Sequence, residues 1–336
     1  MIFRVPSYYN RFKCTADKCT DNCCIGWEIE IDEATRKYYD SVGSDFGERL
    51  KENISADNTF ILKNERCPFL NKNNLCDIII SCGENHLCQI CRDHPRYFEW
   101  YGNIKEGGIG LSCEEGARLI LSDCENCFCE GEIDEENEEV DGELFSLLYS
   151  AREEIFSVLG SDTPLADKLS YILDFAEKLQ FTIDNPHLTE INVTKQSAKG
   201  DLSGIISLYS DFEPIDDLWV KELSEIKKTK AVKVTLTPKA EKYMLNICRY
   251  FIWRYFMKGV FSEEILSKVK LAVVSAVFIF LMCGGSEDIA VWTEKSKLYS
   301  KQMEYSDENR ELFYDYSYEK SCLETEAVAD ICSYLF

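Results

Sequence analysis

The chain has 336 residues, 45% of them hydrophobic and 12% aromatic, which is the composition of a soluble globular protein long enough for two domains. Its formal net charge of −23 argues against a nucleic-acid partner and favours a cationic one, such as a lysine-bearing protein. The 17 cysteines cannot all pair in internal disulfides because their number is odd, and the amino terminus lacks the apolar core of a signal peptide. We therefore expect a cytoplasmic protein whose cysteines bind metal.

Cysteine usage divides the sequence into two parts. Thirteen of the 17 cysteines precede residue 130, and residues 130–143 are nearly all acidic or glycine without apolar periodicity. Such a like-charge block is typical of a solvated linker. The sequence therefore predicts a cysteine-rich domain at 1–129, an acidic linker at 130–143 and an α-helical domain at 144–336.

The first domain shows short elements. Alternation of apolar and polar residues predicts a strand at 27–31, and Asp32 is placed to cap a helix at 34–42. Further patterns predict helices at 46–54 and 111–121, and β-branched runs at 60–62 and 75–80 predict a small hairpin.

The second domain has apolar residues at three- and four-residue steps. They predict helices at 144–159, 165–181, 218–226, 240–261, 262–283 and 290–305. The longest apolar run, 271–283, is shorter than the roughly 20 residues that cross a bilayer, so we expect a buried core helix and no membrane partner. The sequence Lys-Val-Thr-Leu-Thr predicts a strand at 233–237, before Pro238. The expected fold class is mainly α, with a cysteine-rich metal-cluster domain that contains short strands.

The cysteine spacings favour an iron–sulfur cluster. Only Cys88-x2-Cys91 and Cys124-x2-Cys127 have the short spacing of zinc knuckles, and there are far more than four cysteines. A cluster with several irons accepts thiolates from more widely spread positions than a single zinc ion does, so the cluster is the first expectation. Zinc is the alternative. Cys23 and Cys24 are adjacent, and their diverging side chains are expected not to bind the same centre together. Two interpretations, a packed thiol or a metal ligand, stay open for Cys82, Cys88, Cys124, Cys127 and Cys129. The Cys124-x2-Cys127-x-Cys129 run is a candidate accessory zinc site.

Several motifs follow one another in a specific order. They are Cys-x4-Cys-x3-Cys-Cys-x-Gly-Trp from Cys14, Cys67-Pro-Phe-Leu with Leu75-Cys76, Cys91-x3-Pro-Arg, and Ser112-Cys113. This order resembles the flagellin lysine N-methylase family, itself related to small cysteine-cluster domains that chelate zinc or iron, over roughly residues 5 to 121.

The resemblance implies a function, cofactors and ligands. It implies methyl transfer from S-adenosylmethionine to lysine ε-amines of flagellin, with an iron–sulfur cluster, 4Fe–4S, in the cysteine domain. Cys88 falls where the family pattern has a different residue, and His94 where an aromatic residue is usual. The metal ligands that the resemblance implies are Cys14, Cys19, Cys23, Cys24, Cys67, Cys76, Cys91 and Cys113.

Lysine methylation requires a neutral amine, whereas the ordinary lysine pKa is about 10.4, so the site must desolvate the amine and accept a proton. Aromatic faces attract the sulfonium and the methylated ammonium by about 0.5–2 kcal/mol each. The segment Tyr97-Phe98-Glu99-Trp100-Tyr101 supplies such faces. We predict Tyr97 and Tyr101 as the substrate-side catalytic wall, and assign Phe98 and Trp100 more readily to core packing.

A non-enzymatic interpretation explains the cysteines equally well. In it the chain is an iron–sulfur or zinc-binding module for electron transfer, with a helical domain that docks a partner. Binding of S-adenosylmethionine separates the two, because a methylase binds it and a carrier does not.

Overall fold

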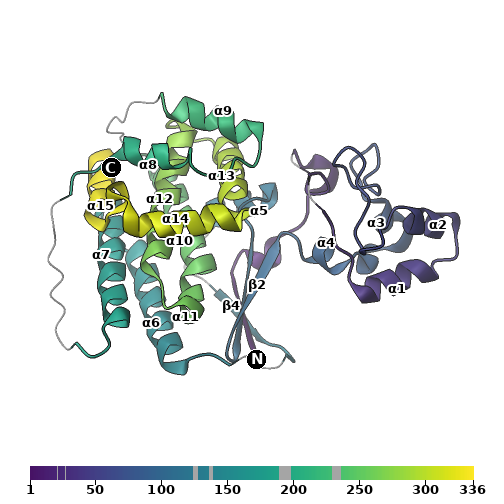
Figure 1. Ribbon diagram of the computed structural model, residues 1–336, viewed down its shortest axis with the longest axis horizontal. Helices are drawn as coiled ribbons and strands as arrows, with labels where there is room; N and C mark the ends of the chain where they lie inside the picture. Colours follow the sequence, from purple (N-terminus) through teal and green to yellow (C-terminus); the bar gives the residue numbers. More distant parts are fainter. Residues whose placement is uncertain (21, 27, 124–127, 136–138, 189–197, 229–235) are drawn as a thin grey trace. The chain divides into compact units, whose positions relative to one another are not determined.

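The computed structural model describes residues 1–20, 22–26, 28–123, 128–135, 139–188, 198–228 and 236–336 (Figure 1). These residues form two compact units. The helical unit contains Met1–Arg11, Phe98–Ser112 and Gly116–Phe336, and the cysteine unit contains Phe12–Tyr97 and Cys113–Glu115. The described residues are mainly helical, as the sequence predicts, and they also form one small sheet, which it does not predict.

One four-stranded sheet has the strand order β2-β3-β1-β4. β1 pairs in parallel with β3 and antiparallel with β4, so the first residues of the chain join the helical unit. Its strands are β1 (Ile2–Pro6), β2 (Arg96–Tyr101), β3 (Ile104–Ile109) and β4 (Phe128–Glu132). β4 ends inside the acidic segment 130–143, so that segment contributes backbone to the sheet instead of serving only as a linker.

The helical unit is built around α12 (Leu266–Cys283), which packs against α7, α10, α13 and α14 (Figure 1). The other helices are α5 (Glu114–Asp123), α6 (Gly142–Leu159), α7 (Leu165–Asp184), α8 (Leu202–Leu208), α9 (Asp217–Ile226), α10 (Pro238–Tyr255), α11 (Gly259–Ser262), α13 (Ile289–Glu304), α14 (Asp307–Glu319) and α15 (Thr325–Leu335). All six helices predicted after residue 144 are confirmed, with shifted ends, whereas α8, α14 and α15 were not predicted. The predicted strand at 233–237 lies largely outside the described residues.

The break between α10 and α12 lies elsewhere than predicted. α10 ends at Tyr255, and α12 begins at Leu266 instead of residue 262. The physical reason is Glu263, whose φ of 56° is left-handed and cannot continue a right-handed helix. Glu264, one residue before the N-cap Ile265, accepts a hydrogen bond of 2.8 Å at its Oε1 from the Ser267 N–H in the first turn of α12.

By length and composition alone, α12 is long and apolar enough to cross a membrane. In this structure 94% of that stretch is buried inside the protein. It is packed as the core helix that the sequence predicts.

The cysteine unit contains α1 (Glu33–Ser41), α2 (Asp45–Glu52), α3 (Asp77–Cys82) and α4 (Gln89–Asp93). The cap of α1 is confirmed, since Asp32 accepts a 2.9 Å hydrogen bond from the Thr35 N–H. The strand predicted at 75–80 is wrong. Residues 77–82 form the helix α3 instead. Asp77, in its first turn, pairs with Arg49 at 2.8 Å, and the helix buries Ile78 while Ile79 and Ile80 stay at the surface.

Candidate metal centre

Six cysteines of the cysteine unit belong to one hydrophobic core. Cys67 and Cys88 are buried in it, with 6% and 0% of their surface exposed, and Cys24, Cys76, Cys82 and Cys91 pack against it. Cys82 ends α3, and the other five come from two loops, the amino-terminal cap of α3, and the cap and body of α4. We call these five, Cys24, Cys67, Cys76, Cys88 and Cys91, the thiol core.

Backbone hydrogen bonds hold the cysteine-bearing segments next to one another. The Cys67 N–H donates to the Cys24 carbonyl at 2.9 Å, and the Asp77 N–H donates to the Phe69 carbonyl at 2.8 Å. Leu70 and Cys76 form an antiparallel bridge across the turn between them. The chain therefore brings Cys24, Cys67 and Cys76 together before any side chain is considered.

The thiols of the core also interact with one another. Cys91 donates a hydrogen bond to Cys88, which raises the pKa of Cys91 and lowers that of Cys88. Burial raises the pKa of Cys67 to about 11, and burial also raises the pKa of Cys76. Charge on neighbouring sulfurs also raises the pKa of Cys67, Cys24 and Cys91.

Cys23 lies at the edge of this core and at the surface of the unit. A hydrogen bond from Cys24 and an interaction with His94 lower the pKa of Cys23 to about 5. The same hydrogen bond, together with burial, raises the pKa of Cys24. The two adjacent thiols therefore differ in environment, with Cys24 toward the core and Cys23 toward His94.

Aromatic side chains surround the thiol core. Tyr39 is fully buried, donates to the His86 carbonyl at 2.8 Å, and has its pKa raised by burial and by the charge of Cys88 and Cys91. Phe60 and Phe69 pack edge to face with ring centroids 5.1 Å apart. Such a shell excludes water, which stabilises a bound metal centre and influences its redox potential.

The donor set fits a thiophilic metal centre. Five thiols in an apolar core form no disulfides with one another, and burial disfavours their thiolate forms unless a positive charge is supplied. Among the described residues, no three His, Cys, Asp or Glu side chains already surround one point as a single ion would require. Sulfur ligands of this number and spread are those that an iron–sulfur cluster accepts.

The structure sorts the eight ligands that the resemblance implies. It brings Cys24, Cys67, Cys76 and Cys91 together, places Cys23 at the edge, and adds Cys88, which the resemblance left out but the Cys88-x2-Cys91 spacing indicates. The ligand assignments themselves stay predictions.

The remaining predicted ligands, Cys14, Cys19 and Cys113, are not part of the described core. Cys14 is exposed and its sulfur accepts from the Ala16 N–H at 3.4 Å. The Cys19 thiol donates to Glu114 at 3.8 Å, beside Cys113 in the chain. Cys124 and Cys127 lie outside the described residues, and Cys129 is exposed on β4.

Tyr97 and Tyr101 lie on β2 and belong to different units. Tyr101 is 2% exposed and stacks on Phe261 with centroids 5.6 Å apart, and burial raises its pKa. Their catalytic assignment stays a prediction, which the rate of lysine methylation by Tyr97→Phe and Tyr101→Phe tests. Phe98 and Trp100, assigned by sequence to the core, are only half buried.

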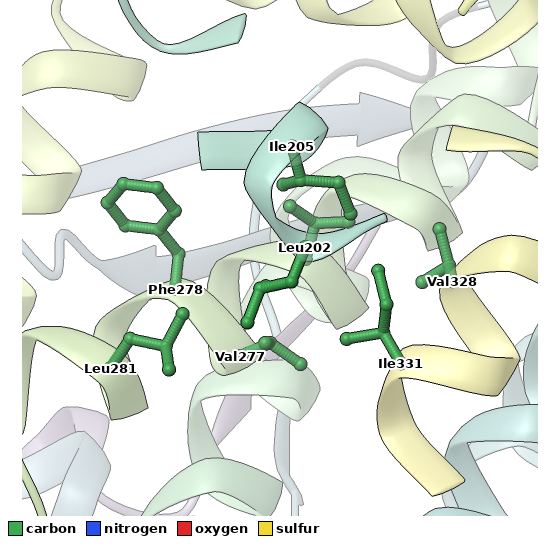
Figure 2. A pocket seen from close by; sticks show the side chains of 8 residues that line it. Leu202, Ile205, Val277, Phe278, Leu281, Val328 and Ile331 are labelled. Carbon is green, nitrogen blue, oxygen red and sulfur yellow. The ribbon is translucent and has the colours of Figure 1, made fainter. Parts of the chain in front are cut away.

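A pocket between α8, α12 and α15 has walls of aliphatic and aromatic side chains (Figure 2). It is lined by Leu202, Ile205, Val274, Val277, Phe278, Leu281, Val328 and Ile331. These side chains offer no hydrogen-bonding partner to the charged amino-acid end or the ribose of S-adenosylmethionine. We therefore do not assign the cofactor to this pocket.

Known proteins resemble part of the chain. It is 30% identical over 128 residues to the lysine-N-methylase of Salmonella typhimurium, which is 35% of this chain and 32% of that protein. It is 30% identical over 132 residues to the flagellar biosynthetic protein FliU of Salmonella muenchen, which is 35% of this chain and 76% of that protein. The chain thus spans about a third of the length of the lysine-N-methylases it matches. No family model and no solved structure matches it.

Proposed function

Because the chain belongs to the flagellin lysine-N-methylase family, we propose that it transfers methyl groups from S-adenosylmethionine to lysine ε-amines of flagellin. The observation that carries this proposal is the 30% identity to proteins named lysine-N-methylase and to a flagellar biosynthetic protein. The net charge of −23 supports it, since such a protein attracts a lysine-rich surface.

The transfer that we propose is a polar displacement. A bond forms between the lysine nitrogen and the methyl carbon, the carbon–sulfur bond breaks, and its electron pair stays on sulfur. The lysine must first lose a proton to solvent, because only the neutral amine has a lone pair to donate. The chain's part is to hold the amine and to exclude water around it.

We propose further that the thiol core holds an iron–sulfur cluster, with Cys24, Cys67, Cys76, Cys88 and Cys91 as the candidate ligands. When bound, such a cluster supplies a structural link between the segments of the cysteine unit and a redox-sensitive group. The support is the convergence of these thiols from separate segments into one water-excluded core. Zinc is the alternative occupant.

The test uses the full chain purified without oxygen and incubated with flagellin and S-adenosylmethionine. Mass spectrometry of flagellin peptides is expected to find methylated lysines, and chemical assay is expected to find iron and acid-labile sulfide. A brown, iron-containing protein that neither binds S-adenosylmethionine nor methylates flagellin would contradict the methylase and favour the electron-transfer module. Zinc without sulfide would contradict the cluster.

A further inference from the structure

The ammonium group of Lys105 lies among three aromatic rings of the helical unit. Its Nζ is 4.6 Å from the centroid of the Trp100 ring, 4.8 Å from that of Phe98 and 5.9 Å from that of Phe3. Distances of this size place a cation within the attractive field of each ring face.

A carboxylate completes the surroundings of this ammonium group. Glu135 Oε1 is 2.7 Å from Lys105 Nζ, and Glu135 Oε2 accepts a hydrogen bond of 3.0 Å from the Trp100 indole N–H. The Glu135 carboxylate is thus held by the Trp100 indole and paired with the Lys105 ammonium group. We call Phe3, Phe98, Trp100 and Glu135 the ammonium cage.

The cage is mounted mostly on strands. Phe3 on β1 is the direct partner of Lys105 on β3, and Phe98 and Trp100 are alternate residues of β2, so they share one face of the sheet. The Lys105 side chain is 14% exposed and that of Glu135 is 39% exposed. The aromatic walls are therefore held in place by the sheet, and the carboxylate side faces solvent.

We propose that the ammonium cage is the binding site for a lysine side chain of the protein substrate, and that Lys105 occupies it in cis as a pseudosubstrate. The substrate's identity rests on the proposed function. Aromatic rings bind an ammonium group whether or not it is methylated, whereas Glu135 requires at least one N–H donor. The cage therefore accepts the unmodified, monomethyl and dimethyl forms of lysine and disfavours the trimethyl form.

Lys258 provides a comparison within the same unit. It also pairs with a carboxylate, that of Glu99, but among the described residues it has one aromatic ring centroid within about 6 Å, that of Tyr255 at 5.8 Å, where Lys105 has three, and its side chain is 37% exposed. A lysine that forms an ion pair is thus not always surrounded by aromatic rings as Lys105 is. Substitution of Lys258 is the matched control.

The experiment measures binding of capped dimethyl-lysine to the full chain by calorimetry and by Trp fluorescence. K105A vacates the cage and is expected to bind the probe on the order of tenfold tighter than the wild type. K105R keeps a cation in the cage and K258A leaves the cage intact, so both are expected to bind as the wild type does. Adding Trp100→Leu to K105A is expected to remove the gain.

The proposal is overturned if K105A, folded by circular dichroism, binds dimethyl-lysine no better than wild type or K258A. Should K105A fail to fold, K105Q serves the same measurement, because a shorter neutral side chain also leaves the cage. Capped trimethyl-lysine, which cannot donate to Glu135, is expected to bind K105A more weakly than the dimethyl form. Equal binding of the two would overturn the role of Glu135.

This binding assay needs no methyl transfer, so its outcome is separate from that of the proposed function. Methylated flagellin without a gain in K105A binding would overturn the cage alone. A gain in binding without any flagellin methylation would overturn the methylase alone. If both hold, K105A is expected to lower the KM for flagellin by the same factor, because the competing internal lysine is gone.

Discussion

Arg152 and Glu106 meet face to face inside the helical unit. Arg152 Nη1 is 2.6 Å from Glu106 Oε2 and Nη2 is 2.5 Å from Oε1, and the two side chains are 0% and 5% exposed. The pair joins α6 to β3, and the Arg152 guanidinium also lies 4.6 Å from the Trp253 ring centroid. A bidentate ion pair of this kind fixes the helix against the sheet geometrically.

Removing one member of this pair is expected to be costly. Glu106→Gln leaves a buried guanidinium without its counter-charge and should lower the free energy of unfolding by about 3–5 kcal/mol, measured by urea denaturation. Replacing both, as Glu106→Leu with Arg152→Met, should cost less than the single change because no charge remains buried. Glu225→Gln, in the exposed pair with Lys228, is the control and should be close to neutral. A larger loss in the double variant would contradict this account.

The candidate ligands give a second prediction. Cys67→Ser, Cys88→Ser and Cys91→Ser should each lose most of the bound iron, because each removes a thiol of the water-excluded core. Cys14→Ser and Cys129→Ser, at exposed positions, should keep it. Iron and sulfide per chain, assayed after oxygen-free purification, are the measurements. Loss of iron in Cys14→Ser with retention in Cys88→Ser would favour the ligand set of the resemblance over that of the structure.

Local patterns predicted the helices well, and tertiary pairing explains what they missed. The cap at Asp32 is a short-range feature, and it is present in the structure. The sheet depends on β1, a strand of five residues at the amino terminus whose partners lie about a hundred residues away, which local periodicity does not contain. The two residues Gly102-Asn103 between β2 and β3 are typical of a tight hairpin turn, and they could have predicted this strand pair.

The site was predicted in part for a similar reason. Spacing and motif order indicated that cysteines converge, but they did not show which cysteines do so. Cys24 belongs to the core, and its carbonyl accepts a hydrogen bond from the Cys67 N–H, whereas Cys14 is exposed. The ammonium cage around Lys105 could not be predicted from the sequence either. It requires Phe3 and Lys105 to be partners in a parallel strand pair, and that register appears only in the fold.

Removal of the metal gives a third prediction. Treatment with an iron chelator should raise amide hydrogen exchange across Phe12–Tyr97, because the proposed cluster joins segments that only short elements otherwise hold. The helices around α12 have their own core and should keep their protection. Uniform loss of protection in both units, or no change in the cysteine unit, would contradict a structural role for the centre.

The last prediction concerns Lys270, which is 4% exposed on α12 and donates to the Ser317 carbonyl at 2.7 Å. Burial lowers the pKa of Lys270 from 10.5 to about 8. Between these values the unfolded chain binds one more proton than the folded protein does, so stability gains from this residue as the pH rises from 8 to 10.5. Below pH 8 both states are protonated and the cost of burial is present in full, about 3 kcal/mol.

The free energy of unfolding of the wild type, relative to that of Lys270→Met, should therefore increase from pH 8 to pH 10 and stay constant from pH 6 to pH 7. Urea denaturation of both proteins across this range measures it, with Lys228→Met, exposed on the same unit, as the control that should show no such change. A flat difference above pH 8 would contradict a depressed pKa at Lys270.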